Sequence, residues 1–296
     1  MAIDLAVVTV AARGIRMLPL TKSQPREMLP VGRKPAVQYV VEELQHSGIR
    51  RLLFITGPEK SSIENHFSVN ENLVDLLRQT CREDYLAELD FERQHLDYFF
   101  TRQRRQLGLG HAVLCAKPLV GSNHFILALG DSIIGKSGPS NIVARMTEVF
   151  EREKPDAVVA IEEIPREEIE QSGIAVPKGT AGDVFDLAHL IEKPSMSEAP
   201  SNLAVAGRYI LSPRLFPHLE TTSPGRDGQI QLTDALGAMI AAGGRVIGVR
   251  LAKDEHRYDI GDFESYFKSF VEFALADPKC GPGLVEHLRK VINKSS

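Results

Sequence analysis

The chain has 296 residues, of which 43% are hydrophobic and 25% are charged, and its formal net charge is −4. This length allows one large α/β domain or two small ones, and the composition is that of an ordinary globular protein. The acidic balance argues against a general nucleic-acid-binding protein, which is usually basic, although local cations still allow a site for one small anionic ligand.

The cysteines and the apolar segments exclude further classes of protein. Cys81, Cys115 and Cys280 are too few and too scattered for a disulfide framework or a zinc site, so we expect a reducing, cytoplasmic environment. The sequence enters its first predicted strand at once, which leaves no room for a signal peptide. No apolar run approaches the roughly 20 residues that span a bilayer. We therefore expect neither a membrane nor a nucleic acid as a partner.

Strands and helices alternate through the first half of the chain. Short apolar runs predict buried strands, and an apolar face at helical spacing predicts a helix. We expect strands at 5–11, 51–56, 97–102, 125–129 and 157–161, and helices at 34–48, 61–67, 71–89, 111–117 and 141–151. This alternation predicts an α/β fold with a doubly wound, mostly parallel, Rossmann-like sheet flanked by helices. Such sheets bind their ligands at the carboxyl ends of the strands.

The second half of the chain has a more mixed pattern. We expect strands at 184–192, 204–211 and 245–251, and helices at 231–242, 263–276 and 283–291. Because no repeat or flexible linker divides the sequence, we predict a single domain over residues 1–296. Its nucleotide-binding half covers about 1–160, and a second-substrate half with a smaller mixed β region covers about 161–296.

The loop after the first strand has the composition of a phosphate-binding loop. The small residues Ala11, Ala12 and Gly14 allow backbone N–H groups to converge on phosphate oxygens, and Arg16 and Arg26 supply positive charge. Each arginine lies close to a Leu-Pro pair, which holds it on a short, stiff segment. A tight turn of any α/β protein is the alternative, since neither G-x-G-x-x-G nor G-x-x-x-x-G-K-[ST] is present.

A second glycine-containing segment runs from Gln103 to His111. Gly108 and Gly110 permit a close approach of the backbone at the start of a helix. The amide of Gln103 both donates and accepts hydrogen bonds, as recognition of a base edge requires. Of the nine histidines, only His111 lies beside a candidate site. Solvated arginines in a surface loop are the alternative explanation.

Charged side chains also follow three predicted strands. Asp131 and Asp259 are candidates to share one Mg²⁺, which prefers carboxylate and phosphate oxygens, although each also suits a turn or a helix start. Glu192 and Lys193, which precede Pro194, offer an acceptor for sugar hydroxyls and a cation for a phosphate. Two solvated charges at a strand end are the alternative for this pair.

Together these segments resemble the bacterial UTP–glucose-1-phosphate uridylyltransferases, within the wider sugar-phosphate nucleotidyltransferase family. The motifs occur in the same order from Ala6 to about Ala274. The matching segments are Gly14 to Pro19, Pro25 to Pro30, Lys34 to Val41, Ser62 to Phe67, Arg102-Gln103, Gly108 to Ala116, Glu192 to Pro194, Gly207 to Tyr209 and Ile230 to Ala235.

The resemblance implies a reaction and its partners. A uridylyl group passes from UTP to glucose 1-phosphate and gives UDP-glucose and pyrophosphate, with Mg²⁺ as cofactor. Because the attacking phosphate is already anionic, catalysis needs positioning and charge neutralisation rather than a general base. The second half of the chain then holds the sugar phosphate and the contacts of a homo-oligomer, a dimer or a tetramer.

The resemblance also implies a role for each candidate residue. The nucleotide contacts are Ala11, Ala12, Gly14, Arg16, Arg26, Gln103, Gly108 and Asp131. The sugar-phosphate contacts are Gly173, Glu192 and Lys193, and the metal ligands are Asp131 and Asp259. The catalytic residues among them are Arg16, Arg26, Asp131 and Lys193.

Several positions depart from the family pattern. Ala12 replaces a glycine, Ile15 a threonine, Arg26 a lysine, Gln229 a glutamate and Ser172 a tyrosine. These departures keep open a weakly active or non-catalytic regulatory relative that binds UDP-glucose or an active subunit. The same chemistry with dTTP or another hexose 1-phosphate also stays open, because one methyl group separates thymine from uracil. A dinucleotide-dependent oxidoreductase is disfavoured by the missing glycine fingerprint.

Overall fold

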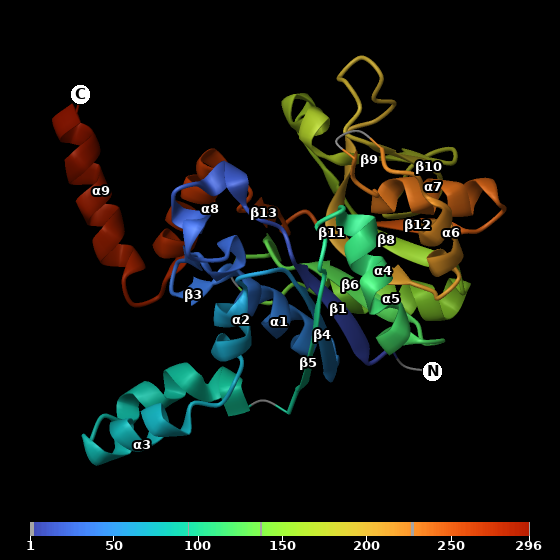
Figure 1. Ribbon diagram of the computed structural model, residues 1–296. Helices are drawn as coiled ribbons and strands as arrows, with labels where there is room; N and C mark the ends of the chain where they lie inside the picture. The colour runs from blue at the N-terminus through green and yellow to red at the C-terminus, as the bar shows by residue number, and fades with distance from the viewer. Residues whose placement is uncertain (1–2, 94, 137, 226–227, 296) are drawn as a thin grey trace.

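A nine-stranded sheet runs through the centre of the molecule (Figure 1). The computed structural model describes residues 3–93, 95–136, 138–225 and 228–295. The strand order is β5-β4-β1-β6-β11-β8-β12-β10-β9. In chain order the strands are β1 (Leu5–Val10), β4 (Arg51–Thr56), β5 (Asp97–Arg102), β6 (Phe125–Leu129), β8 (Ala157–Glu163), β9 (Gly173–Pro177), β10 (Val184–Glu192), β11 (Leu203–Leu211) and β12 (Val246–Arg250).

The direction of the strands changes halfway across the sheet. β5, β4, β1 and β6 are mutually parallel, as predicted for the first half of the chain. β11 then lies antiparallel between β6 and β8, and β10 is antiparallel to both β12 and β9. The predicted mixed β region is therefore a continuation of the same sheet, and both halves of the chain share one layer.

Helices cover both faces of this sheet. Side chains alternate along a strand, so Leu5 and Val7 of β1 face one helical layer while Ala6 and Val8 face the other. The first layer contains α4 (Leu109–Val120), α6 (Leu215–Thr221) and α7 (Leu232–Ala241), and the second contains α1 (Ala36–His46), α2 (Ser61–His66) and α5 (Ile142–Glu153). Because both faces are covered, β1 is apolar along its whole length.

Three further helices lie at the periphery: α3 (Glu71–Gln79), α8 (Phe263–Ala276) and α9 (Gly281–Ser295). In Figure 1, α3 and α9 extend away from the body of the molecule. The helix predicted over 71–89 was wrong beyond Gln79. Cys81 adopts a left-handed φ of 55°, which ends an α-helix, and residues 83–93 form 3₁₀ turns instead.

Short elements that the sequence pattern did not reveal complete the fold. β7 (Ser132–Ile134) pairs antiparallel with β13 (Arg257–Asp259), which joins the two halves of the chain. β2 (Pro30–Val31) pairs with β3 (Lys34–Pro35), so the helix predicted from Lys34 begins at Ala36. α6 and β9 were also not predicted. The remaining 3₁₀ turns are Ile15–Met17, Leu20–Lys22, Arg26–Met28 and Arg166–Gln171.

A buried ion pair connects β11, the central strand of the sheet, to α1. Arg208 is fully buried in the middle of β11, and its guanidinium donates to both carboxylate oxygens of Glu43, at 3.0 and 2.8 Å. A further hydrogen bond of 2.9 Å reaches the carbonyl oxygen of Ser132 at the start of β7. Arg208 therefore fixes the backbone directly after Asp131.

Among the described helices, none is both long enough and apolar enough to cross a membrane. Cys81, Cys115 and Cys280 are all free thiols.

Candidate functional site

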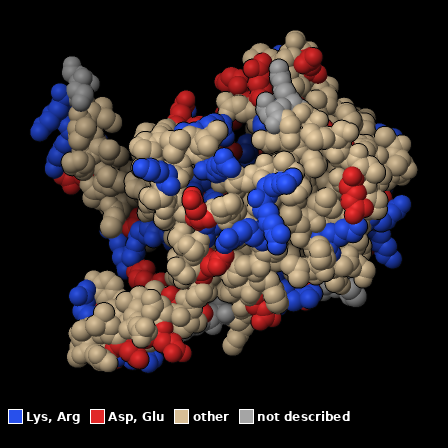
Figure 2. All heavy atoms as spheres, viewed as in Figure 1, with Lys and Arg blue, Asp and Glu red and all other residues tan. Residues whose placement is uncertain are grey.

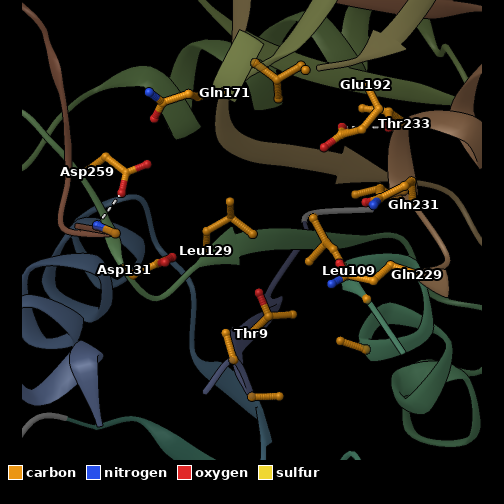
Figure 3. A pocket seen from close by; sticks show the side chains of 18 of the residues that line it. Thr9, Leu109, Leu129, Asp131, Gln171, Glu192, Gln229, Gln231, Thr233 and Asp259 are labelled. Atoms are coloured by element: carbon orange, nitrogen blue, oxygen red, sulfur yellow. Dashed lines mark hydrogen bonds between the residues drawn. The ribbon is translucent and has the colours of Figure 1, made fainter. Parts of the chain in front are cut away.

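A cavity of about 750 Å³ lies at the carboxyl ends of β1, β5, β6 and β10. Its volume is typical of small-molecule sites. Figure 2 shows Lys and Arg side chains around the hollow in the middle of the molecule, and Figure 3 shows the polar side chains that point into it. Every candidate site residue lines this one cavity: Ala11, Ala12, Gly14, Arg16, Arg26, Gln103, Gly108, Asp131, Gly173, Glu192, Lys193 and Asp259.

The loop after β1 is held in place by side chains on either side of it. Gly14 has a φ of 67°, and its carbonyl oxygen accepts a hydrogen bond of 2.7 Å from the hydroxyl of Thr21. The amide of Gln106 donates to the carbonyl oxygen of Ala11. These contacts fix the backbone on both sides of Ala12.

The substitution at Ala12 is compatible with this backbone. A positive φ favours glycine, and within the described ranges the non-glycine residues with positive φ are Glu59, Cys81, Lys154 and Lys193. Ala12 is not one of them, and its side chain is exposed to the cavity. Ala12 therefore needs no left-handed conformation. The side chain of Ile15 is 69% exposed beside the same cavity.

Arg26 is the central cation of the site. Its Nη2 forms an ion pair with Asp131, and its Nε lies 3.7 Å from Oε1 of Glu27. Burial lowers the pKa of Arg26, but the carboxylates of Asp131, Glu27 and Asp259 outweigh it and leave the pKa raised. The guanidinium therefore remains charged.

Lys60 and Glu27 form a buried ion pair next to Arg26. Nζ of Lys60 donates to Oε2 of Glu27 at 2.6 Å, and both side chains are almost fully buried. Burial raises the pKa of Glu27, and the cations of Lys60 and Arg26 oppose that rise. Since the two cations flank one carboxylate, Glu27 holds Arg26 in a fixed place at the cavity wall.

The pairing of β7 with β13 brings the two candidate metal ligands together. Asp259 pairs with Ser132 across the ladder, and the backbone N–H of Ile260 donates to the carbonyl oxygen of Asp131 at 3.4 Å. In Figure 3 both carboxylates lie on the same side of the cavity. Asp259 is oriented by the backbone N–H of Gly261 at 2.6 Å and by Nη1 of Arg257 at 3.1 Å.

The segment from Gln103 to His111 forms the opposite wall. Gly108 has a φ of 98°, and a Cβ there would lie 2.6 Å from the carbonyl oxygen of Ile230. The glycine is therefore required by the fold as well as by any close approach of a ligand. The side chain of Gln103 is only 3% exposed, yet it borders the cavity and donates to the carbonyl oxygen of Gly108 at 3.1 Å.

The third part of the wall comes from β9, β10 and α7. Glu192 pairs with Gly173 across the β9–β10 ladder, and Thr233 donates to Oε2 of Glu192 at 2.9 Å. Nζ of Lys193 lies 3.5 Å from Oε1 of Glu192, and its side chain is 55% exposed. An acceptor fixed by a hydroxyl and an exposed cation thus stand side by side, which suits sugar hydroxyls next to a phosphate.

The cavity residues that the sequence analysis did not single out include Gln106, Thr233 and Arg257. Gln106 and Thr233 lie inside segments that were noted, but nothing in the pattern marks their side chains. Arg257 is buried between Glu162, at 3.3 Å, and Asp259, at 3.1 Å. Its closeness to Asp259 in sequence was the one available signal.

Comparison with known proteins agrees with this geometry. The family model described as nucleotidyl transferase matches residues 5–274. The UTP–glucose-1-phosphate uridylyltransferase YngB of Bacillus subtilis is 39% identical over 291 residues, covering 98% of this chain and 96% of that protein. A UTP-bound UGPase from Acinetobacter baumannii has a TM-score of 0.87 and 35% identity, over 97% of this chain and 98% of the other.

A UDP-glucose pyrophosphorylase complexed with UDP-glucose aligns with a TM-score of 0.79 and 33% identity, over 90% of this chain and 97% of the other. These similarities extend over both walls of the cavity rather than over the sheet alone. The chain therefore belongs to the nucleotidyl transferase family and, within it, to the group of the UTP–glucose-1-phosphate uridylyltransferases.

Proposed function

We propose that this protein transfers a uridylyl group from UTP to glucose 1-phosphate and releases pyrophosphate. One observation carries the proposal: residues from both halves of the chain, chosen from the sequence for phosphate, base, metal and sugar, line a single cavity. The chain then acts as one nucleotidyltransferase domain, with the base wall in its first half and the sugar wall around Glu192 in its second.

The chain's own residues supply positioning and charge. Arg26 and Arg16 neutralise the phosphates of the nucleotide, and Lys193 pairs with the phosphate of the sugar. Gln103 reads the base, while Glu192, fixed by Thr233, accepts from sugar hydroxyls. The attacking oxygen is already anionic, so the site needs no general base.

The donor set also fits a magnesium ion. Mg²⁺ is usually bound by one or two carboxylates together with substrate phosphates and water. Asp131 and Asp259 provide such a pair, whereas the described residues contain no group of three or more His, Cys, Asp or Glu that holds a metal by itself. When bound, the ion would withdraw charge from the phosphoryl oxygens. We therefore propose Mg²⁺ as the cofactor.

Two further features belong to this proposal. Phe267 and Val271 on α8 are 57% and 43% exposed, which supports a homo-oligomer formed through the second half of the chain. We also propose a cytoplasmic location, which the small number and scattered spacing of the cysteines support.

The direct test is to incubate the pure protein with Mg²⁺, UTP and glucose 1-phosphate and to separate the products by chromatography. We expect UDP-glucose and pyrophosphate in equal amounts, and almost none with the Asp131→Asn variant. Turnover of dTTP in place of UTP would change the assignment of the nucleotide, and turnover of another hexose 1-phosphate would change the assignment of the sugar. Binding of UDP-glucose without turnover would favour the regulatory alternative, and no binding would refute both substrate assignments.

The replacement of the family lysine by Arg26 leads to a separate prediction. An Arg26→Lys variant keeps the charge beside Asp131 and Glu27, so we expect a kcat/KM within about tenfold of the native value. An Arg26→Met variant has a similar length without the charge, and we expect a loss of about 100-fold or more. The rate of pyrophosphate release measures both. Equal losses in the two variants would show that the shape of the side chain, and not its charge, is required.

A further inference from the structure

His111 lies behind the base wall, at the start of α4, and is not among the residues that line the cavity. Its Nδ1 is 2.8 Å from Nε2 of Gln103, the residue proposed to read the base. Because His111 does not line the cavity, it acts on the ligand through Gln103, the recognition residue that it contacts. The direction of this hydrogen bond therefore decides which atom of Gln103 faces the base.

The direction follows from the neighbouring carbonyl group. A carbonyl oxygen only accepts hydrogen bonds, so the atom of Gln103 that lies 3.1 Å from the carbonyl oxygen of Gly108 is the amide nitrogen. The second hydrogen of that nitrogen points to Nδ1 of His111, which must then accept it. His111 is thus neutral, with its proton on Nε2.

Two further observations agree with a neutral His111. Burial lowers the pKa of its imidazole. Sγ of Cys115, one helical turn later, lies 3.9 Å from the same Nδ1, and burial raises the pKa of this thiol, which keeps its proton available as a weak donor. The single lone pair of Nδ1 is thus taken by the amide of Gln103 at 2.8 Å, and the neutral thiol of Cys115 lies farther away.

Oε1 of Gln103 is the amide atom that is left to face the ligand. Both hydrogens of Nε2 are used, and within the described part of the chain no hydrogen bond reaches Oε1 of Gln103. An acceptor at this point suits N3 of uracil, which carries a hydrogen. The same acceptor repels N3 of cytosine, because that nitrogen carries a lone pair and no hydrogen.

We infer that His111 is a positioning residue for the choice of base, because it holds the amide of Gln103 with Oε1 toward the nucleotide and so selects UTP over CTP. Gly108 alone holds the amide less firmly, since its carbonyl oxygen also accepts the N–H of Ala112 at 3.1 Å. The inference rests on the proposed function insofar as Gln103 reads the base.

The test compares two variants at one position. In His111→Asn the side-chain oxygen takes the place of Nδ1, whereas His111→Leu leaves no acceptor. Dissociation constants of UTP and CTP, measured by calorimetry with Mg²⁺, give a preference for UTP that does not depend on turnover. We expect the preference to fall about 10- to 100-fold in His111→Leu, the effect of one lost, partly buried hydrogen bond, and to stay within about threefold in His111→Asn.

Different outcomes separate the inference from the proposed function. Equal weakening of UTP and CTP by His111→Leu, or no preference for UTP in the native protein, would overturn the inference. A native protein that prefers UTP but forms no UDP-glucose would refute the proposed reaction and leave the inference standing. A second measurement does not depend on the His111→Leu variant. The ¹⁵N chemical shifts of the His111 ring are identified by their absence from the spectrum of His111→Asn. We expect them to show an unprotonated Nδ1 at pH 7, and a protonated Nδ1 would contradict the inference.

Discussion

An Asp131→Asn variant is expected to form UDP-glucose about 10²- to 10³-fold more slowly than the native protein. Asparagine has the same shape but no charge, so the site loses one of its two carboxylates while β7 keeps its place. Arg26 loses its ion-pair partner at the same time, although Glu27 remains beside it. The rate of pyrophosphate release at saturating substrates measures the loss, and the Mg²⁺ concentration for half-maximal rate is expected to rise.

The matched control is Asp4→Asn. Asp4 also carries an ion pair, with Arg51 at 2.6 Å, but it is half exposed and does not line the cavity. We expect its rate and Mg²⁺ dependence to be unchanged. A near-native rate for Asp131→Asn would show that Asp131 is not a catalytic residue. If Asp131→Asn unfolds at a much lower temperature than Asp4→Asn, the role of Asp131 is to stabilise the fold.

The second large effect concerns stability. Glu43→Ala leaves the fully buried guanidinium of Arg208 without its carboxylate, and breaking such a pair costs about 3–5 kcal/mol of unfolding free energy. Urea unfolding followed by circular dichroism measures the difference. The expected loss is large because Arg208 then keeps only the carbonyl oxygens of Ser132 and Gly207 as acceptors.

Two further variants make this prediction specific. Glu286→Ala removes an exposed partner of Lys290 on α9, and such pairs contribute less than about 0.5 kcal/mol. The double variant Glu43→Leu with Arg208→Met removes both buried charges, and we expect it to recover much of the loss. A Glu43→Ala variant as stable as Glu286→Ala would mean that water or a rearrangement satisfies Arg208.

Many residues of the candidate site could be located from the sequence, because the fold brings the ends of several strands together at one edge of the sheet. An apolar run in the sequence predicts a buried strand, and the residues directly after such a strand lie at the carboxyl edge of the sheet. Asp131 after β6 and Glu192 at the end of β10 were therefore placed correctly from local pattern alone. The bounds of β5, β6 and α8 also agree with the prediction, since β6 is a short, uninterrupted apolar run and all three segments have clear ends.

The remaining features depend on contacts between distant segments. β7 and β13 have three residues each, too few for a period to be visible, so the sequence did not show that Asp131 and Asp259 meet. Arg208 interrupts an apolar strand and is explained only by Glu43, which lies on another element. The end of α3 depends on the left-handed conformation of Cys81, which no residue preference predicts.

The ladder between β7 and β13 also has a consequence for the order in which a newly made chain becomes active. Asp131 leaves the ribosome with the first half of the chain, but its partner Asp259 arrives only with the last segments. Domains fold as they are synthesised, from the N-terminus onward. A nascent or prematurely terminated chain that lacks β13 keeps Asp131 but lacks Asp259, so it carries one of the two proposed metal ligands. Under the proposed function, such a chain is expected not to turn over its substrates until synthesis has passed Asp259.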